Sequence, residues 1–320
     1  YSDTAMPQAI ALIPTDMTTS RLGLRAMLDK TIAGKTVLAH TVTRIAQIES
    51  IKKIGITHPA SQKPRPLLAG QSFNKPVDYF PAHDGWSDAY TPMRIAARKW
   101  ALTAWRGGLG GATCYDELLP AKPLADAMTQ FKADAALVVG ADWLFVDSKI
   151  SGDVLKLHLD NAEGMPMTFS QAPPGLAGIA VARHLIEELA EKQGTFGGIL
   201  AYNPSHAQPD PIGRDLCIQL PGVIRACMMR FIYDTPRTRA MIDCIAKRLG
   251  DRMTTADAAE IATIARSFTQ EDHCSFASLP REVTLEVTPK REVKGPILPQ
   301  FHINLDRDTM PTDAAIRLVQ

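Results

Sequence analysis

The chain has 320 residues, of which 45% are apolar and 22% charged, so it can fold around a core and is not a disordered polypeptide. Its 35 Lys and Arg against 34 Asp and Glu leave a net charge of +1, which gives no reason to expect nucleic acid or an acidic membrane as partner. No apolar run reaches the roughly 18 residues of a spanning helix, and the N-terminus carries no export signal. We therefore expect a soluble, cytoplasmic protein. We also expect that the chain is cut at both ends from a longer one.

The first third of the chain alternates strand-like and helix-like segments. Residues 9–14 (AIALIP) predict a buried strand, 37–48 an amphipathic helix and 53–57 a second strand, with a polar loop at 15–30. This order of strand, loop, helix and strand is the unit of a parallel sheet whose crossover helices cover its faces. The sequence therefore predicts an α/β fold with a mostly parallel sheet.

The same periodicities continue through the rest of the chain. They predict the helices 94–105, 118–132, 150–159, 178–192 and 236–249 and the strands 77–80, 135–139, 166–170 and 230–233. The composition changes near Gly250, where an alanine-rich helix (254–268) and an alternating strand (282–288) follow. We predict a first domain over 1–249 and a short partial second domain over 250–320.

The cysteines and histidines form no motif of known chemistry. Five cysteines, at 114, 217, 227, 244 and 274, include no CxxC pair, so a disulfide framework, a zinc ribbon and an iron–sulfur cluster are not expected. The eight histidines show no HExxH spacing, and His40 falls in the periodic pattern of a helix, as a core residue would.

Two aspartates follow strand-like runs. Asp142 comes just after the buried strand 135–139, at the edge where open α/β sheets bind ligands, and it can hold Mg²⁺ or simply cap the next turn. Asp234 precedes Thr235 and Pro236, a triplet that capping of the next helix also explains. If the two carboxylates face each other across the sheet, they form a magnesium and phosphate site.

Three loops can approach a phosphate or a base. They are the segment 18–23 after the first strand, the glycine-rich segment 107–113 before a helix, and the rigid segment 171–178 with its double proline; each can also be no more than a turn. The candidate nucleotide-contacting residues in or near these loops are Arg21, Gly23, Arg25, Lys30, Gly110, Gly111, Thr113, Pro174 and Gly175.

The order of these motifs resembles a known family. AIALIP, TTSRLG, IAGKTVLAHTVTRI, VVGADWLFVD and FIYDTPRT, in this order over about residues 8–249, resemble the nucleotidyltransferases that include the CMP-sugar synthetases and the molybdenum cofactor guanylyltransferase-like proteins. The resemblance implies a GT-A-like Rossmannoid fold and attack on the α-phosphorus of a nucleoside triphosphate. It further implies Asp142 and Asp234 as ligands of Mg²⁺, Arg21 and Gly23 near the triphosphate, and a nucleotide or nucleotide sugar as ligand.

The chain departs from that pattern at two places. Family members have a glycine-rich loop directly after the first strand, where this chain has 14–17 (PTDM), and a lysine where this chain has Leu28. Asp16 would then face the triphosphate and repel it, while Arg21, Arg25 or Lys30 could replace the missing cation. We therefore predict weakened nucleotide binding and slow or absent turnover.

The C-terminal segment adds a second resemblance. Residues 280–289 (PREVTLEVTP) resemble the first strand of a radical SAM barrel, although no cysteine triad follows. Together with the first domain, this resembles the spiro-SPASM group of radical SAM proteins. The alternative function is therefore a non-catalytic recognition or scaffold domain that serves a radical SAM region.

Overall fold

The computed structural model describes residues 8–21, 23–86, 120–161, 164–192, 217–227 and 229–268, together with the backbone of the three strands at 283–287, 300–305 and 316–319. The predicted helix 94–105 lies outside the described residues. So do Gly110, Gly111 and Thr113 of the glycine-rich loop.

A seven-stranded sheet forms the centre of the fold, in the order β5-β4-β1-β6-β8-β7-β9. Strands β5, β4, β1 and β6 are parallel, β8 is antiparallel to both of its neighbours, and β9 is parallel to β7. The mostly parallel sheet predicted from the sequence is therefore confirmed. Its strands are β1 (Ala9–Pro14), β4 (Ile54–Pro59), β5 (Val77–Ala82), β6 (Ala135–Val138), β7 (Met167–Ser170), β8 (Ile179–Ala182) and β9 (Cys217–Ile218).

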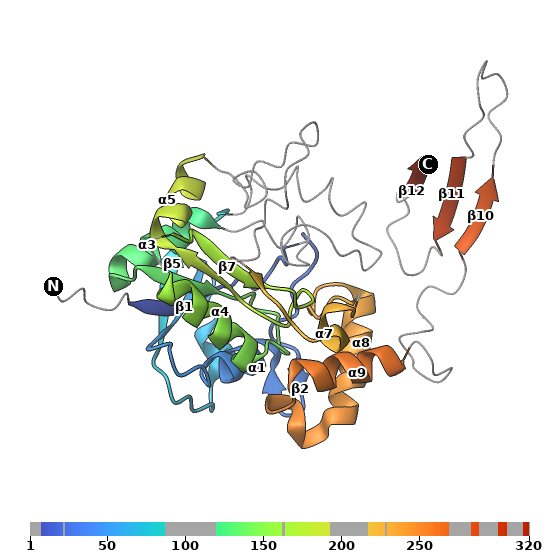
Figure 1. Ribbon diagram of the computed structural model, residues 1–320, viewed down its shortest axis with the longest axis horizontal. Helices are drawn as coiled ribbons and strands as arrows, with labels where there is room; N and C mark the ends of the chain where they lie inside the picture. Colours follow the sequence, from blue (N-terminus) through green and yellow to red (C-terminus); the bar gives the residue numbers. More distant parts are fainter. Residues whose placement is uncertain are drawn as a thin grey trace, which may run out of the picture.

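Helices cover both faces of this sheet, which gives three layers (Figure 1). On one face lie α1 (Val37–Ile45) and α4 (Ser148–Asp160), and on the other lie α3 (Ala121–Phe131) and α5 (Arg183–Lys192). Strands β1 and β6 alternate between the two cores, as Ala11 and Leu137 pack toward α1 while Leu12 and Val138 pack toward α3. This alternation is what a strand buried on both faces requires.

Smaller elements complete the main body. The hairpin β2 (Thr31–Ile32) and β3 (Lys35–Thr36) leads directly into α1, and the 3₁₀ helix η1 (Arg65–Leu68) lies between β4 and β5. Downstream lie α7 (Gly222–Arg225), α8 (Pro236–Leu249), the 3₁₀ helix η5 (Gly250–Thr254) and α9 (Ala258–Ser267).

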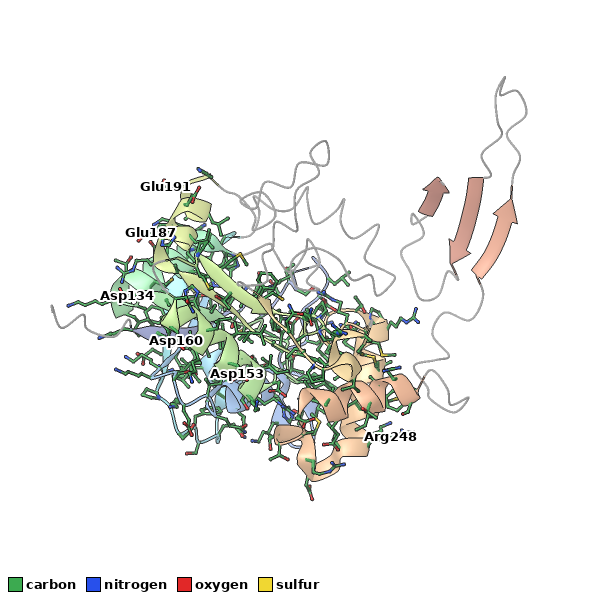
Figure 2. All side chains as sticks on the ribbon, in the orientation of Figure 1. Asp134, Asp153, Asp160, Glu187, Glu191 and Arg248 are labelled. Carbon is green, nitrogen blue, oxygen red and sulfur yellow. The ribbon has the colours of Figure 1, made fainter. Side chains whose placement is uncertain are left out.

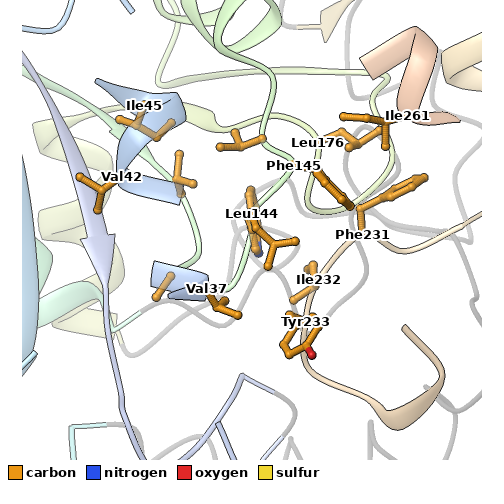
Figure 3. Close-up of a cluster of buried hydrophobic side chains, with 14 of the residues drawn as sticks. Val37, Val42, Ile45, Leu144, Phe145, Leu176, Phe231, Ile232, Tyr233 and Ile261 are labelled. Carbon is orange, nitrogen blue, oxygen red and sulfur yellow. The ribbon is translucent and has the colours of Figure 1, made fainter. Parts of the chain in front are cut away.

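The C-terminal helices share a core with the sheet. Figure 3 shows Ile261 of α9 in the same cluster as Phe145, Phe231 and Ile45 of α1. The buried guanidinium of Arg44 in α1 donates to the carbonyls of Met253 (2.8 Å) and Ala256 (2.9 Å). Residues 250–268 thus pack against the first 249, and the predicted domain boundary near Gly250 stays a prediction.

Three elements differ from the sequence prediction. Residues 178–192 are not one helix, because Ile179–Ala182 form β8 and the helix begins at Arg183. The segment 230–233 lies in no strand. The predicted alanine-rich helix begins at Ala258 rather than at residue 254, and its cap is Asp257, whose side chain accepts from the backbone N–H of Glu260.

The last described strands form a sheet of their own. Strands β10 (Val283–Val287), β11 (Gln300–Leu305) and β12 (Ile316–Val319) pair antiparallel. The predicted strand at 282–288 is confirmed. Its antiparallel pairing does not support the resemblance to a radical SAM barrel, whose strands run in parallel.

Charged side chains lie mainly on the outer surfaces of the main body. Figure 2 shows Asp153 and Asp160 on α4 and Glu187 and Glu191 on α5, pointing away from the sheet. Among the described helices, none is both long and apolar enough to cross a bilayer.

Candidate functional site

The candidate site lies at one edge of the central sheet. Because β1, β4 and β6 are parallel, their carboxyl ends meet at the same edge. The polypeptide after each strand, including the loop at 15–30 and Asp142, starts there. The loop at 171–178 reaches the same edge, since it joins the end of β7 to the start of the antiparallel β8.

The loop after β1 is organised by the carboxylate of Asp16. Its Oδ1 accepts from the backbone N–H groups of Thr18 (2.9 Å) and Thr19 (3.0 Å) and from the amide of Gln62 (2.9 Å). Burial acts to raise the pKa of Asp16, but these hydrogen bonds outweigh it and the pKa is lowered. Oδ1 of Asp16 is thus engaged by its own loop and by Gln62. The expectation that Asp16 faces the triphosphate stays a prediction.

Gly23 and Arg21 lie in a tight turn of this loop. Gly23 has a φ of +75°, which favours glycine, and its N–H donates to the carbonyl of Ser20 at 2.8 Å. The guanidinium of Arg21 lies 5.3 Å from the ring centroid of Trp143, the residue after Asp142. The turn therefore brings Arg21 to the carboxyl end of β6.

Arg25 and Lys30, the other candidate cations, are exposed. Leu28, where the family carries a lysine, is 3% exposed and belongs to the core around α1. A side chain at this position points into the core and not toward the sheet edge. No lysine there could reach a phosphate without a change in the path of the loop.

The structure brings Asp142 and Asp234 together. The backbone N–H of Tyr233 donates to the carbonyl of Asp142 at 3.1 Å, so the residues next to Asp234 pair with the end of the β6 loop. Burial, and to a lesser extent the charge of Asp234, raises the pKa of Asp142, while the guanidinium groups of Arg21 and Arg230 act to lower it. Two carboxylates and two guanidiniums thus share this site.

Asp234 does not cap the helix that follows it. The cap of α8 is Thr235, which forms a capping box with Thr238, and Pro236 takes the first helical position as predicted. The Asp234 carboxylate contacts the first turn of α8 through the hydroxyl of Thr238 and does not act as the cap.

Arg230 is a site residue that the sequence analysis missed. Its Nη2 and Nε donate to Oδ2 of Asp234 at 2.7 and 3.2 Å, and the side chains of Arg230 and Asp234 are 6% and 0% exposed. Oδ1 of Asp234 accepts from the hydroxyl of Thr238 at 3.2 Å. The one signal in the sequence was an arginine four residues before the aspartate, which is too common to single out.

The loop at 171–178 supports this segment from behind. The N–H of Phe231 donates to the carbonyl of Pro174 at 2.8 Å, and a Cβ on Gly175 would lie 2.3 Å from the carbonyl oxygen of Phe231. Gly175 has a φ of +92°. The close backbone approach expected at Gly175 is therefore present, toward Phe231, and the nucleotide contact predicted for Pro174 and Gly175 stays a prediction.

A second aspartate after β6, Asp147, has a structural role. Asp147 is buried; its Oδ1 accepts from the N–H of Ile150 at the start of α4 (2.9 Å) and its Oδ2 from that of Ala258 at the start of α9 (2.7 Å). Asp142 and Asp147, five residues apart, thus serve the candidate site and the attachment of α9, respectively.

In the described part of the chain, no cluster of three or more His, Cys, Asp and Glu side chains could hold a metal. The donor set is the Asp142–Asp234 pair. Two carboxylates at one sheet edge fit a hard cation that takes its remaining ligands from phosphate and water, as Mg²⁺ does.

Comparison with solved structures identifies similar folds. A cytidylyltransferase from Leptospira borgpetersenii serovar Hardjo-bovis is 14% identical, with 82% of this chain and 96% of that one covered at a TM-score of 0.54. CMP:2-keto-3-deoxy-manno-octonic acid synthetase in complex with CTP is 12% identical (67% and 90% covered, TM-score 0.39). Rv0371c from Mycobacterium tuberculosis H37Rv is 13% identical (75% and 98% covered, TM-score 0.43).

The likeness to the Leptospira protein shows that this chain has a cytidylyltransferase-like α/β fold. The TM-scores of the other two are too low for a conclusion. No family model and no curated protein matches the chain.

Proposed function

We propose that the chain binds a nucleoside triphosphate or a nucleotide sugar at the carboxyl edge of its sheet and belongs functionally to the nucleotidyltransferases. The observation that carries this proposal is the meeting of Asp142, Asp234 and Arg21 at one point of a cytidylyltransferase-like fold. The Leptospira neighbour is a cytidylyltransferase, so CTP is the first nucleotide to test.

In the proposed reaction an acceptor oxygen attacks the α-phosphorus, the bond to the β-phosphate oxygen breaks, and pyrophosphate leaves. Arg21 would bind phosphate oxygens, and its contact with Trp143 limits the conformations of its side chain before the ligand arrives. Asp16 holds the loop of Arg21 in shape through its bonds to Thr18 and Thr19.

Asp142 and Asp234 would hold Mg²⁺. The ion, when bound, would offset the charge of the phosphate oxygens. Burial, and to a lesser extent the charge of Asp234, raises the pKa of Asp142, and a cation between the two carboxylates would offset their repulsion.

We propose further that turnover is weak. Leu28 is buried where the family has a lysine, and the removal of one preorganised donor from a transition state typically costs about 3–4 kcal/mol. The same observation supports the second candidate, a recognition domain that binds a nucleotide without turnover.

Isothermal titration with each of the four nucleoside triphosphates and with CMP-sugars, in the presence of Mg²⁺, tests the binding. Release of pyrophosphate with a panel of sugar acids and phosphosugars tests the reaction. We expect binding that is lost in Asp142→Asn, and turnover far below ordinary enzymatic rates. Binding without turnover would favour the recognition domain, and no binding at all would refute both.

A further inference from the structure

The guanidinium of Arg230 uses the whole hydrogen-bond acceptor capacity of one carboxylate oxygen of Asp234. A carboxylate oxygen accepts about two hydrogen bonds, and Oδ2 already takes two N–H groups of Arg230, at 2.7 and 3.2 Å. Oδ1 takes one, from the hydroxyl of Thr238 at 3.2 Å. Among the described residues, the acceptor capacity that Asp234 keeps for a ligand is therefore on Oδ1, which has only the hydroxyl of Thr238 beside it.

The surroundings keep this carboxylate from turning. Both partners of the ion pair are buried, and the segment that joins them is tied to Pro174 through Phe231 and to Asp142 through Tyr233. A rotation of the Asp234 carboxylate would break its contacts with Arg230 and Thr238, and it would leave buried polar groups without their partners.

We propose that Arg230 is a positioning residue of the Asp142–Asp234 site, which fixes Asp234 as a ligand that binds through Oδ1 alone. This inference rests on the proposed function, because it assumes that the carboxylate pair takes a cation. It assigns the greater share of cation binding to Asp142 and makes the contribution of Asp234 depend on Arg230.

Arg230 affects the affinity for a cation in two ways that have opposite signs, so an experiment can separate them. The guanidinium repels a cation, and its removal alone would tighten binding. The guanidinium also orients Asp234, and its loss leaves a buried carboxylate without the two N–H donors on Oδ2, free to turn. If positioning dominates, removal weakens binding.

The test is Mn²⁺ binding, followed by the electron paramagnetic resonance signal of free Mn²⁺, with and without CTP. We expect Arg230→Met to weaken Mn²⁺ binding at least tenfold and Arg230→Lys, which keeps a charge beside Oδ2, to remain within about threefold of the unmodified chain. Tighter binding by Arg230→Met, or unchanged binding, would overturn the inference.

Arg44→Met is the matched control. Arg44 is also buried, in the same core, but it donates to the carbonyls of Met253 and Ala256 and touches neither carboxylate of the pair. We expect it to lower the melting temperature as Arg230→Met does while leaving Mn²⁺ affinity unchanged. An equal loss of affinity in both variants would mean that Arg230 acts through overall stability and would overturn the inference.

The outcome for the unmodified chain separates the two proposals. If it binds Mn²⁺ neither alone nor with CTP, the proposed function fails and the inference falls with it. If it binds and only the Arg230 variants behave otherwise than expected, the inference fails alone.

Discussion

Protonation of His158 should make the stability of this protein depend on pH. The side chain lies fully buried on α4, with its Nδ1 3.2 Å from the hydroxyl of Thr168. Burial, and to a lesser extent the charge of His184, lowers the pKa of His158 from 6.5 to about 4. Within the described residues its Nε2 has no hydrogen-bond partner, so a proton there would have no acceptor.

The sign follows from which state binds the proton. Between pH 6.5 and 4 the unfolded chain protonates this histidine and the folded protein does not, so the free energy of unfolding falls as the pH falls. At 1.36 kcal/mol for each pKa unit, the loss is about 2 kcal/mol at pH 5 and approaches about 3 kcal/mol below pH 4.

Urea denaturation at pH 7, 6 and 5 measures this term when His158→Gln is compared with the unmodified chain. The difference in free energy of unfolding between the two should change by about 2 kcal/mol from pH 7 to pH 5, in favour of the variant at low pH. His83→Gln, at an exposed position, should leave the pH dependence unchanged. A constant difference between His158→Gln and the unmodified chain would refute the reasoning.

Three further substitutions test the supports of the site by thermal and urea unfolding. Gly175→Ala should cost at least about 2 kcal/mol more than Gly70→Ala, since both have a positive φ but only Gly175 has a backbone oxygen within 2.3 Å of the new Cβ; equal costs would contradict this. Asp147→Ala should cost about 2–3 kcal/mol, because two helix N-termini lose an acceptor, and a cost under about 0.5 kcal/mol would contradict the double cap. Leu28→Lys should cost about 3 kcal/mol or more and should not raise nucleotide affinity; a gain in affinity would show that the loop can change its path.

The sequence predicted the parallel half of the fold well because each of its elements carries a local signal. The strands β1, β4 and β6 are short apolar runs, and α1 and α8 have helical spacing with caps at Thr36 and Thr235. The strand β8 was missed because Ile179–Ala182 runs without a break into α5, and its apolar residues also fit a helical period. Only its pairing with β6 and β7 decides in favour of a strand, and that pairing is not local.

Of the candidate site, the sequence predicts most directly the residues that follow a strand. Asp142 could be found because it follows a buried strand, and a parallel strand delivers its next residues to the ligand edge whatever the rest of the chain does. Asp234 follows no strand, and its place depends on hydrogen bonds from Phe231 to Pro174 and from Tyr233 to Asp142. No spacing within one segment encodes such contacts.

Arg230 is a site residue that could not be predicted from the sequence, because its contact with Asp234 depends on a loop that is distant along the chain. Arg230 lies four residues before Asp234, in a segment that is not helical, so helical spacing does not bring the two side chains together. Their contact depends instead on the path of the backbone at 230–234, which passes close to Gly175. The contact between Arg230 and Asp234 therefore depends on the loop at 171–178, which lies against this segment. A family motif copied onto Asp142 and Asp234 alone predicts two open carboxylates, whereas packing leaves one of them held on an arginine.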